Sequence, residues 1–380
     1  MNNFKTSDSM KFFLVANLGY TLTKFRKELF IELSKRGEDV YLLCPAHTDF
    51  DNEMNKYSEH HIPVNLNRGG INPFIDILTL IDFYKKLQNY KPDIILNFTI
   101  KPAIYMSLVA GLFSNSKIYS NLTGLGYIFS QKGIKVYLLR LLVIFLYKVS
   151  LRYNEKVFFQ NPDDASLFLK YKIVKKNQIV LLNGSGLNIS EFRKNIIDVV
   201  KLPYSFIFVG RILKDKGVGE LIESYKEIKK RHPQVILTLI GDIDEDNPNS
   251  FKRNDISIWE NECGLRYLGR VEDVREELLR HQVFVLPSYR EGTPRSALEA
   301  MALKLPIIVT DVPGCREVIK DKINGIKIAL FDISQLTDAM EFFIENQTQI
   351  LSMGEESYNY VCEKFDVIQV NNKILKTIMS

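Results

Sequence analysis

The amino-acid sequence predicts an α/β protein of two domains, each built on a doubly wound parallel β-sheet. Short apolar runs alternate with amphipathic helical patterns along most of the chain, which is typical of strand–helix–strand units. The alternation occurs in two series, and a polar segment with two glycines, residues 183–188, separates them. A chain of 380 residues is also longer than one hydrophobic core usually serves.

The first series begins with an apolar run at residues 11–16, which predicts a strand. An amphipathic helix is expected over residues 23–36, and residues 40–44 predict the second strand. Helical patterns separate most of the remaining strands of this series, which are expected at residues 62–66, 94–97, 117–122, 157–160 and 179–182.

The second series starts near Tyr204 and predicts another parallel sheet. Its strands are expected at residues 206–209, 235–240, 283–286, 307–310 and 325–329. We therefore expect an N-terminal domain over residues 1–190 and a C-terminal domain over residues 191–362. Residues 363–380 are expected to form a helix that packs back on the N-terminal domain.

Composition excludes several classes of protein. The apolar fraction of 46% and the charged fraction of 25% are those of an ordinary globular protein. The four cysteines are scattered without a CxxC pair, which argues against a zinc site or a disulfide framework and for a reducing compartment. The polar N-terminus does not resemble a signal peptide, and no apolar run reaches the roughly 20 residues that cross a bilayer. We expect a cytoplasmic protein.

Two glutamates eight positions apart, Glu291 and Glu299, follow the strand expected at residues 283–286. Three residues break the chain after the first glutamate, Gly292, Thr293 and Pro294, and residues 296–302 then predict a helix. Backbone N–H groups at the start of a helix favour an anionic ligand. Two carboxylates would oppose a phosphate unless they bind something else, such as sugar hydroxyls. The alternative is a loop whose glutamates are merely solvated.

Basic and small residues follow other strands of the two sheets, where doubly wound domains bind their ligands. Arg211 and Lys216 lie in a glycine-bounded loop and could hold a diphosphate, although such a loop is often plain surface. Gly19 follows the first strand and could let a phosphate approach the backbone, or could be an ordinary turn residue. The chain has neither a GxGxxG nor a GxxxxGK[ST] motif, so a nicotinamide cofactor or ATP hydrolysis lacks its usual signature.

Residues 311–317 follow the strand expected at residues 307–310 and predict a small-residue loop that opens a helix, with Glu317 near the helix start. A tight turn and a capped helix explain Pro313 and Glu317 without a role in binding. Nothing in this segment marks Cys315 as a nucleophile.

Acidic residues are absent from residues 94–154, whereas basic residues recur along this segment. The helix expected over residues 136–153 is rich in Leu, Val, Ile, Phe and Tyr, and the basic residues in and beside it include Lys135, Arg140 and Lys148. Such a helix suits the plane of an anionic membrane, and the alternative is a core helix with basic ends. Nucleic acid is disfavoured, because no nucleic-acid motif accompanies the basic stretch and the net charge is only +5.

Taken together, these motifs resemble those of the retaining glycosyltransferases of family 4. The matching segments occur in the family's order and spacing, and they are residues 209–217, 284–288, 291–299 and 306–317, with the hinge at residues 183–192. The resemblance covers nearly the whole chain. It implies the GT-B fold, in which two Rossmann-like domains face a cleft.

The resemblance also implies roles for single residues. Arg211 and Lys216 would hold the donor's diphosphate, Glu291 would lie against the donor sugar, and Glu299 would bind the ribose. Arg270 and Val271 would contact the base, and the loop of Gly19 would approach the donor phosphates. The two basic side chains would make a metal unnecessary, and no cofactor is implied beyond the donor substrate.

The N-terminal half departs from many family members, because residues 121–127 contain no histidine. With residues 68–73 and the basic helix, this segment resembles bacterial N-acetylgalactosaminyltransferases and capsule or O-antigen transferases that extend undecaprenyl-diphosphate-linked sugars. Thr123 is the candidate residue on the acceptor side. The resemblance implies transfer of a hexose or N-acetylhexosamine from a UDP-sugar to such a lipid, on the inner face of the cytoplasmic membrane. A sugar-nucleotide epimerase and a non-catalytic sugar-binding protein are the alternatives.

Overall fold

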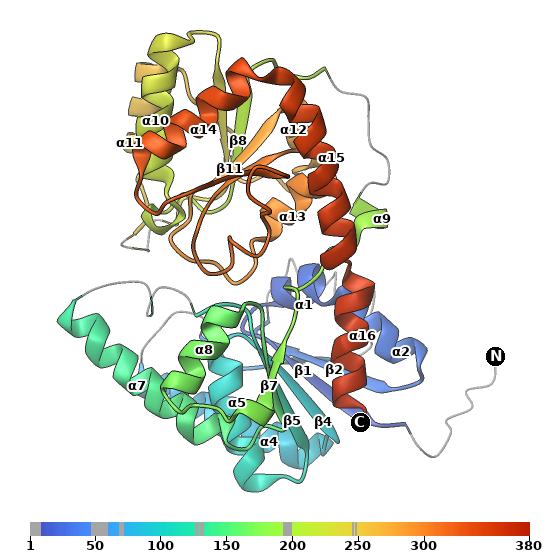
Figure 1. Cartoon of the computed structure of the whole chain (residues 1–380). Coiled ribbons are helices and arrows are strands. Elements are labelled where there is room, and N and C mark those ends of the chain that lie inside the picture. The colour runs from blue at the N-terminus through green and yellow to red at the C-terminus, as the bar shows by residue number, and fades with distance from the viewer. Residues whose placement is uncertain are drawn as a thin grey trace. The chain divides into compact units, whose positions relative to one another are not determined.

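The computed structural model describes residues 9–46, 60–67, 72–125, 129, 133–192, 200–244, 247 and 249–380. The chain divides into two compact units, which are shown in Figure 1. Unit 1 consists of Met1–Gly186 together with Ile368–Ser380, and unit 2 is Leu187–Val367. Each unit contains one parallel sheet, as the alternation of strands and helices predicts.

Unit 1 is built on a seven-stranded sheet of order β3-β2-β1-β4-β5-β6-β7, in which every pair is parallel. The strand order reverses at β1, from which the chain winds outward in both directions, and this is the doubly wound topology. The strands are β1 (Lys11–Val15), β2 (Asp39–Cys44), β3 (His61–Pro63), β4 (Ile94–Phe98), β5 (Lys117–Leu122), β6 (Lys156–Phe159) and β7 (Ile179–Leu181).

Helices cover both faces of the unit 1 sheet. Four of them share buried clusters with one face, and they are α4 (Pro73–Tyr90), α5 (Ile100–Phe113), α7 (Ile134–Leu151) and α8 (Pro162–Lys170). The other face packs against α1 (Gly19–Phe25), α2 (Lys27–Lys35) and the C-terminal α16 (Val367–Ile378). Within α16, Val370, Ile374, Leu375 and Ile378 are buried against this face, so the last helix belongs to the core of unit 1.

The helix expected over residues 23–36 is two helices, because the chain breaks at Arg26. The backbone of Arg26 has φ −132° and ψ 6°, and its side chain is almost fully buried. The guanidinium donates a hydrogen bond to Ser185 Oγ at 3.2 Å and lies 4.7 Å from the centre of the Phe98 ring. These contacts come from residues far along the chain, so periodicity could not predict the break.

Unit 2 is built on a six-stranded parallel sheet of order β10-β9-β8-β11-β12-β13. Its strands are β8 (Ser205–Val209), β9 (Ile236–Ile240), β10 (Arg266–Tyr267), β11 (Val283–Leu286), β12 (Ile307–Thr310) and β13 (Gly325–Ile328). The two-residue β10 is too short to give a periodic signal, and the sequence did not predict it.

One large buried cluster joins the unit 2 sheet to its helices. These helices are α9 (Ile189–Phe192), α10 (Val218–Arg231), α11 (Arg253–Cys263), α12 (Arg275–Arg280), α13 (Arg295–Ala302), α14 (Ile333–Glu345) and α15 (Gln347–Lys364). The prediction of a helix opening at residues 311–317 is wrong: this segment forms turns, and the next helix is α14. The Glu317 carboxylate accepts a hydrogen bond from the Gly314 N–H at 2.7 Å, which stabilises a turn rather than a helix start.

Candidate active site

The candidate site lies at the carboxyl edge of the unit 2 sheet. Because all strands are parallel, the segments that follow β8, β11 and β12 leave the sheet at the same edge. This edge is where doubly wound sheets bind their ligands. The segment after β8 contains Lys216, the segment after β11 contains Glu291, and the segment after β12 contains Gly314.

Lys216 and Glu291 form an ion pair at this edge, although 75 positions separate them in the chain. Glu291 Oε1 accepts hydrogen bonds from Lys216 Nζ and from Ser288 Oγ, the latter at 2.8 Å. The Lys216 side chain is 19% exposed and that of Glu291 is 14% exposed. Both charges are therefore partly desolvated and close enough to act on one ligand. Both of these bonds are to Oε1, and within the described ranges no hydrogen bond is made to the second oxygen, Glu291 Oε2.

Two glycines let the three segments approach each other closely. Gly217 has φ +71°, and a Cβ there would lie 2.1 Å from Pro287 O at the end of β11. Gly314 has φ +87°, and a Cβ there would lie 2.3 Å from Glu291 O. Backbone hydrogen bonds fix these contacts: Tyr289 N–H donates to Asp215 O and Glu291 N–H donates to Pro313 O, both at 2.9 Å. The backbone that presents Glu291 is thus held from two sides.

Glu299 lies in α13, and its Oε1 accepts a hydrogen bond from Arg295 Nε at 3.0 Å. Desolvation raises the pKa of Glu299, and the charge of Arg295 opposes this shift. Pro294 is the N-cap residue of α13 and is buried, as is Gly292, whereas Thr293 is half-buried. The three residues therefore form the predicted junction between β11 and α13.

The remaining predicted donor residues of unit 2 are more exposed. Arg211 follows β8, is exposed, and its Nη1 lies 3.7 Å from Asp244 Oδ2. Arg270 and Val271 follow β10, where Arg270 is exposed and Val271 packs against the core of unit 2. Their segment is tied to the end of β9, because Gly241 N–H donates to Gly269 O at 2.8 Å. Among the described residues, no ion pair joins Arg211 or Arg270 to the Lys216–Glu291 pair, so their shared role stays a prediction.

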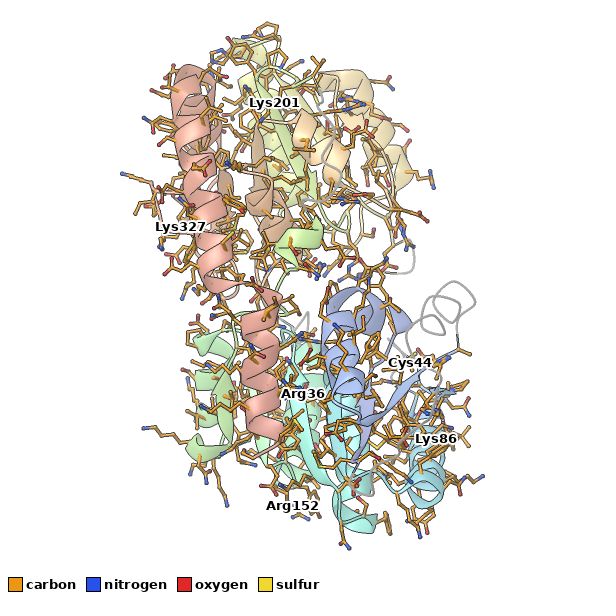
Figure 2. The ribbon with its side chains drawn as sticks, turned by 90° about the vertical axis from the view of Figure 1, so that its right-hand side faces the viewer. Arg36, Cys44, Lys86, Arg152, Lys201 and Lys327 are labelled. Carbon is orange, nitrogen blue, oxygen red and sulfur yellow. The ribbon has the colours of Figure 1, made fainter. Side chains whose placement is uncertain are left out.

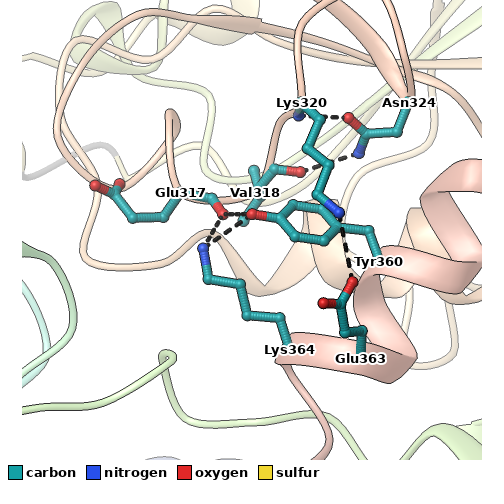
Figure 3. A network of polar contacts seen from close by, with 7 residues as sticks. All are labelled: Glu317, Val318, Lys320, Asn324, Tyr360, Glu363 and Lys364. Carbon is teal, nitrogen blue, oxygen red and sulfur yellow. Dashed lines mark hydrogen bonds and ion pairs between the residues drawn. The ribbon is translucent and has the colours of Figure 1, made fainter.

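A polar network beside the site was not predicted from the sequence, and Figure 3 shows it. On α15, Lys364 Nζ and Tyr360 Oη each donate a hydrogen bond to Glu317 O, at 2.9 and 3.1 Å. Lys320 lies over the Tyr360 ring, 4.2 Å from its centre. Because Glu317 holds Gly314, and Gly314 contacts the backbone of Glu291, α15 supports the candidate site. The sequence signal was weak: the tyrosine and lysine are four positions apart in a helix, as many unrelated pairs are.

Unit 1 contains the other predicted site residues, and their relation to the donor residues of unit 2 stays a prediction. Gly19 is the buried first residue of α1, and Thr23 Oγ1 donates to its carbonyl oxygen at 3.3 Å. Thr123 is half-buried after β5. On α7, Arg140 is half-buried and Lys148 is exposed, whereas the side chain of Lys135 and most of residues 68–73 and 126–128 lie outside the description.

Two further features concern only the described part of the chain. There, no group of three or more His, Cys, Asp or Glu side chains could hold a metal ion. None of the helices in these ranges combines the length and the apolar character needed to cross a membrane.

Comparison with known proteins gives matches over both halves of the chain. The family model "Glycosyl transferases group 1" matches residues 190–360, and "Glycosyl transferase 4-like" matches residues 11–161. The chain is 26% identical over 360 residues to the N,N'-diacetylbacillosaminyl-diphospho-undecaprenol alpha-1,3-N-acetylgalactosaminyltransferase of Campylobacter jejuni. That match covers 92% of this chain and 93% of the relative.

A second relative and a solved structure agree with the first match. The chain is 25% identical over 309 residues to the UDP-Gal:alpha-D-GlcNAc-diphosphoundecaprenol alpha-1,3-galactosyltransferase of Escherichia coli, which covers 79% of this chain and 78% of the relative. The crystal structure of a glycosyltransferase from Rickettsia africae has a TM-score of 0.78 and covers 98% of both chains. At 18% identity, this structure shows the shared fold alone.

Proposed function

We propose a reaction for this chain from the premise that it belongs to the family 4 glycosyltransferases of GT-B fold and is an enzyme that transfers a sugar. Its donor is a UDP-sugar, with an N-acetylhexosamine as the sugar that we favour. Its acceptor is a saccharide carried on a polyprenyl diphosphate during bacterial glycan assembly. The names of the two relatives support this reaction, because one transfers N-acetylgalactosamine and the other uses UDP-Gal, both onto diphosphoundecaprenol-linked sugars.

The observation that carries the proposal is the Lys216–Glu291 pair at the carboxyl edge of the unit 2 sheet. When the bond between the sugar and UDP breaks, negative charge develops on the diphosphate. The partly buried Lys216 ammonium stabilises this charge more strongly than a fully solvated cation would. Arg211 is exposed, and its ion pair with Asp244 is a long one, at 3.7 Å. Because the guanidinium is not tightly packed, it supplies a planar fork for the phosphates.

Glu291 acts on the sugar rather than on the diphosphate. Its Oε1 accepts hydrogen bonds from Lys216 and Ser288, which orients the carboxylate. Oε2 is then the oxygen that accepts from a hydroxyl of the donor sugar. Glu299 accepts from the ribose hydroxyls, and the segment with Arg270 and Val271 contacts the base.

The transfer retains the configuration at the anomeric carbon. The acceptor hydroxyl attacks from the face that the diphosphate leaves, and an oxygen of the leaving diphosphate takes the hydroxyl proton. The bond from the anomeric carbon to the acceptor oxygen forms as the bond to UDP breaks. Lys216 and Arg211 balance the charge of the leaving group, so the reaction needs neither a metal nor a cofactor.

The acceptor places the enzyme at the inner face of the cytoplasmic membrane. A lipid-linked saccharide stays at the bilayer, so an enzyme that binds the membrane surface meets this acceptor more often. We assign this contact to α7, whose residues 134–151 include three basic residues and no acidic residue. Thr123, after β5, is a further candidate for contact with the acceptor.

Transfer of radiolabelled sugar from a panel of UDP-sugars to a polyprenyl-diphosphate-linked saccharide tests the proposal. Lys216→Ala and Glu291→Ala should each lower the rate at least about 100-fold. Lys230→Ala and Glu227→Ala are matched controls, because both residues are exposed on α10 of unit 2, outside the loop that contains Arg211 and Lys216. NMR of the product reports the anomeric configuration, and the assay is repeated with EDTA. Wild-type rates in both site variants would contradict the assignment.

A further inference from the structure

An exposed apolar stripe runs along α4, a helix to which no functional role was assigned from the sequence. Phe74, Ile77, Leu78 and Ile81 recur at intervals of three and four residues and all are exposed, with Phe74 at 79% and Leu78 at 59%. The opposite side of the helix carries Thr79, Phe83 and Leu87, which are buried. The helix is therefore apolar on the side that faces the core and on the side that faces away from it.

A second stripe of the same kind lies on α7. Ile134, Leu138, Leu141 and Phe145 are all exposed, with Ile134 at 74% and Phe145 at 60%, and they too lie on one side of their helix. The opposite side carries Val143, Ile144, Tyr147 and Leu151, which are buried in the core of unit 1. Like α4, this helix therefore carries apolar residues both on the side that faces the core and on the side that faces away from it.

The two stripes belong to one layer of helices on one face of the unit 1 sheet. Between α4 and α7, helix α5 shares the buried clusters of both, through Ala103 and Ile104 toward α7 and through Met106 and Val109 toward α4 (Figure 1). The connections between parallel strands start all three helices at the carboxyl edge of the sheet. Phe74 and Ile134, which begin the two stripes, are therefore both near this edge.

The charges of α4, α5 and α7 are mainly basic. Helices α4, α5 and α7 contain six basic residues and two acidic residues, Asp76 and Asp82. Both carboxylates are neutralised within the layer: Asp76 accepts from Lys101 at 2.8 Å, and Asp82 accepts from Lys86 at 2.7 Å. Figure 2 labels Lys86 on α4. These three helices thus combine exposed apolar side chains with a net positive charge.

We propose that α4 and α7 together form one surface, the α4–α7 surface, that inserts its apolar side chains into the interface of an anionic bilayer. Apolar side chains gain free energy in the acyl boundary, and the basic residues attract anionic headgroups. The α4–α7 surface extends the contact assigned to α7 to a second helix, and its biological meaning rests on the proposed lipid-linked acceptor. Two helices across one layer also fix the orientation of unit 1 on the membrane, which a single helix does not.

The charge pattern favours a bilayer over a second copy of this chain as the occupant. If two copies joined through this face, the excess basic residues of each would meet the same charges on the other. Anionic headgroups instead complement them.

Flotation with vesicles of phosphatidylethanolamine and phosphatidylglycerol tests the α4–α7 surface. We expect the double variant Phe74→Ser and Leu78→Ser to lower the membrane partition coefficient at least about tenfold. The matched control is Val200→Ser with Leu351→Ser, because these two apolar residues are 89% and 75% exposed in unit 2. Both double variants should keep the wild-type circular dichroism spectrum and melting temperature, since none of the four side chains is buried.

Tryptophan fluorescence with brominated lipids gives an independent measurement. Leu78→Trp should be quenched by the vesicles and Leu351→Trp should not, against the constant signal of Trp259, the one tryptophan of the chain. An unchanged bound fraction in the α4 variant would overturn the proposal. The proposal would also be overturned if the α4 variant lost a dimer in sedimentation but kept its vesicle binding, because the occupant would then be a second copy of the chain. Transfer to a water-soluble short-chain acceptor separates the membrane proposal from the proposed function. If neither the wild type nor any variant transfers sugar to this acceptor, the proposed function fails, while flotation still tests the α4–α7 surface.

Discussion

Replacement of Gly314 by alanine would test whether the backbone contact behind Glu291 matters for catalysis. Gly314 has φ +87°, and its Cα faces the carbonyl oxygens of Glu291 and Gly292. A Cβ at this position would lie 2.3 Å from the first oxygen and 2.6 Å from the second. The substitution therefore combines backbone strain with a collision against the chain that presents the carboxylate.

The magnitude follows from these two effects. A left-handed backbone costs a residue with a Cβ about 1–2 kcal/mol in the free energy of unfolding. Since real Cβ atoms stay at least 3.0 Å from such neighbours, the Glu291 backbone must withdraw by about 0.7 Å. A misplacement of about 1 Å at a reacting group can lower a rate about 100-fold, so we expect Gly314→Ala to lose roughly tenfold to 100-fold in kcat/KM.

The assay compares this variant with Gly264→Ala, a control of matched strain. Gly264 has φ +66° at the end of α11, but a Cβ there would meet no heavy atom within 4 Å. Gly264→Ala should lose about 1 kcal/mol of unfolding free energy and keep the wild-type rate of sugar transfer. Urea denaturation measures the first quantity for both variants, and radiolabelled transfer measures the second. Equal transfer rates in the two alanine variants would refute the reasoning, because the collision would then have no effect on the site.

Three further predictions concern other parts of the molecule. Lys364→Met keeps the aliphatic stem but removes the hydrogen bond to Glu317 O, so it should lower the unfolding free energy by about 1 kcal/mol and reduce kcat/KM, whereas Lys373→Met on α16 should do neither. Burial lowers the pKa of His281 to about 4, so the native state binds fewer protons than the unfolded state between about pH 4 and 6.5. The unfolding free energy should fall by up to about 3 kcal/mol as the pH drops through this range, and His281→Gln should flatten the urea midpoint profile. Replacement of Lys135, Arg140 and Lys148 by glutamate should reduce flotation with anionic vesicles but not with neutral ones. An unchanged bound fraction would count against a membrane role of these three residues.

Several features of this protein could be predicted from the sequence because they depend on neighbours in the chain. Alternating apolar runs and helical patterns predicted two parallel sheets, and the structure contains both. The junction of Glu291 with Gly292, Thr293 and Pro294 was expected between a strand and a helix, and it lies between β11 and α13. Apolar periodicity and breaks at glycine or proline are local signals, so they can be recognised in the sequence alone.

Other features exist only in the tertiary structure, because they join residues that are distant in the chain. The break at Arg26 depends on Phe98 and Ser185, and the turns at residues 311–317 depend on support from α15. The sequence placed Lys216 and Glu291 in different loops, and the parallel sheet brings those loops to one edge, where the two side chains pair. The exposure of Phe74 and its neighbours could not be predicted either. An apolar residue in a helix gives the same sequence pattern whether it faces the core or the surface. Only packing decides which apolar face is covered, because burial is a property of the whole fold and not of the segment.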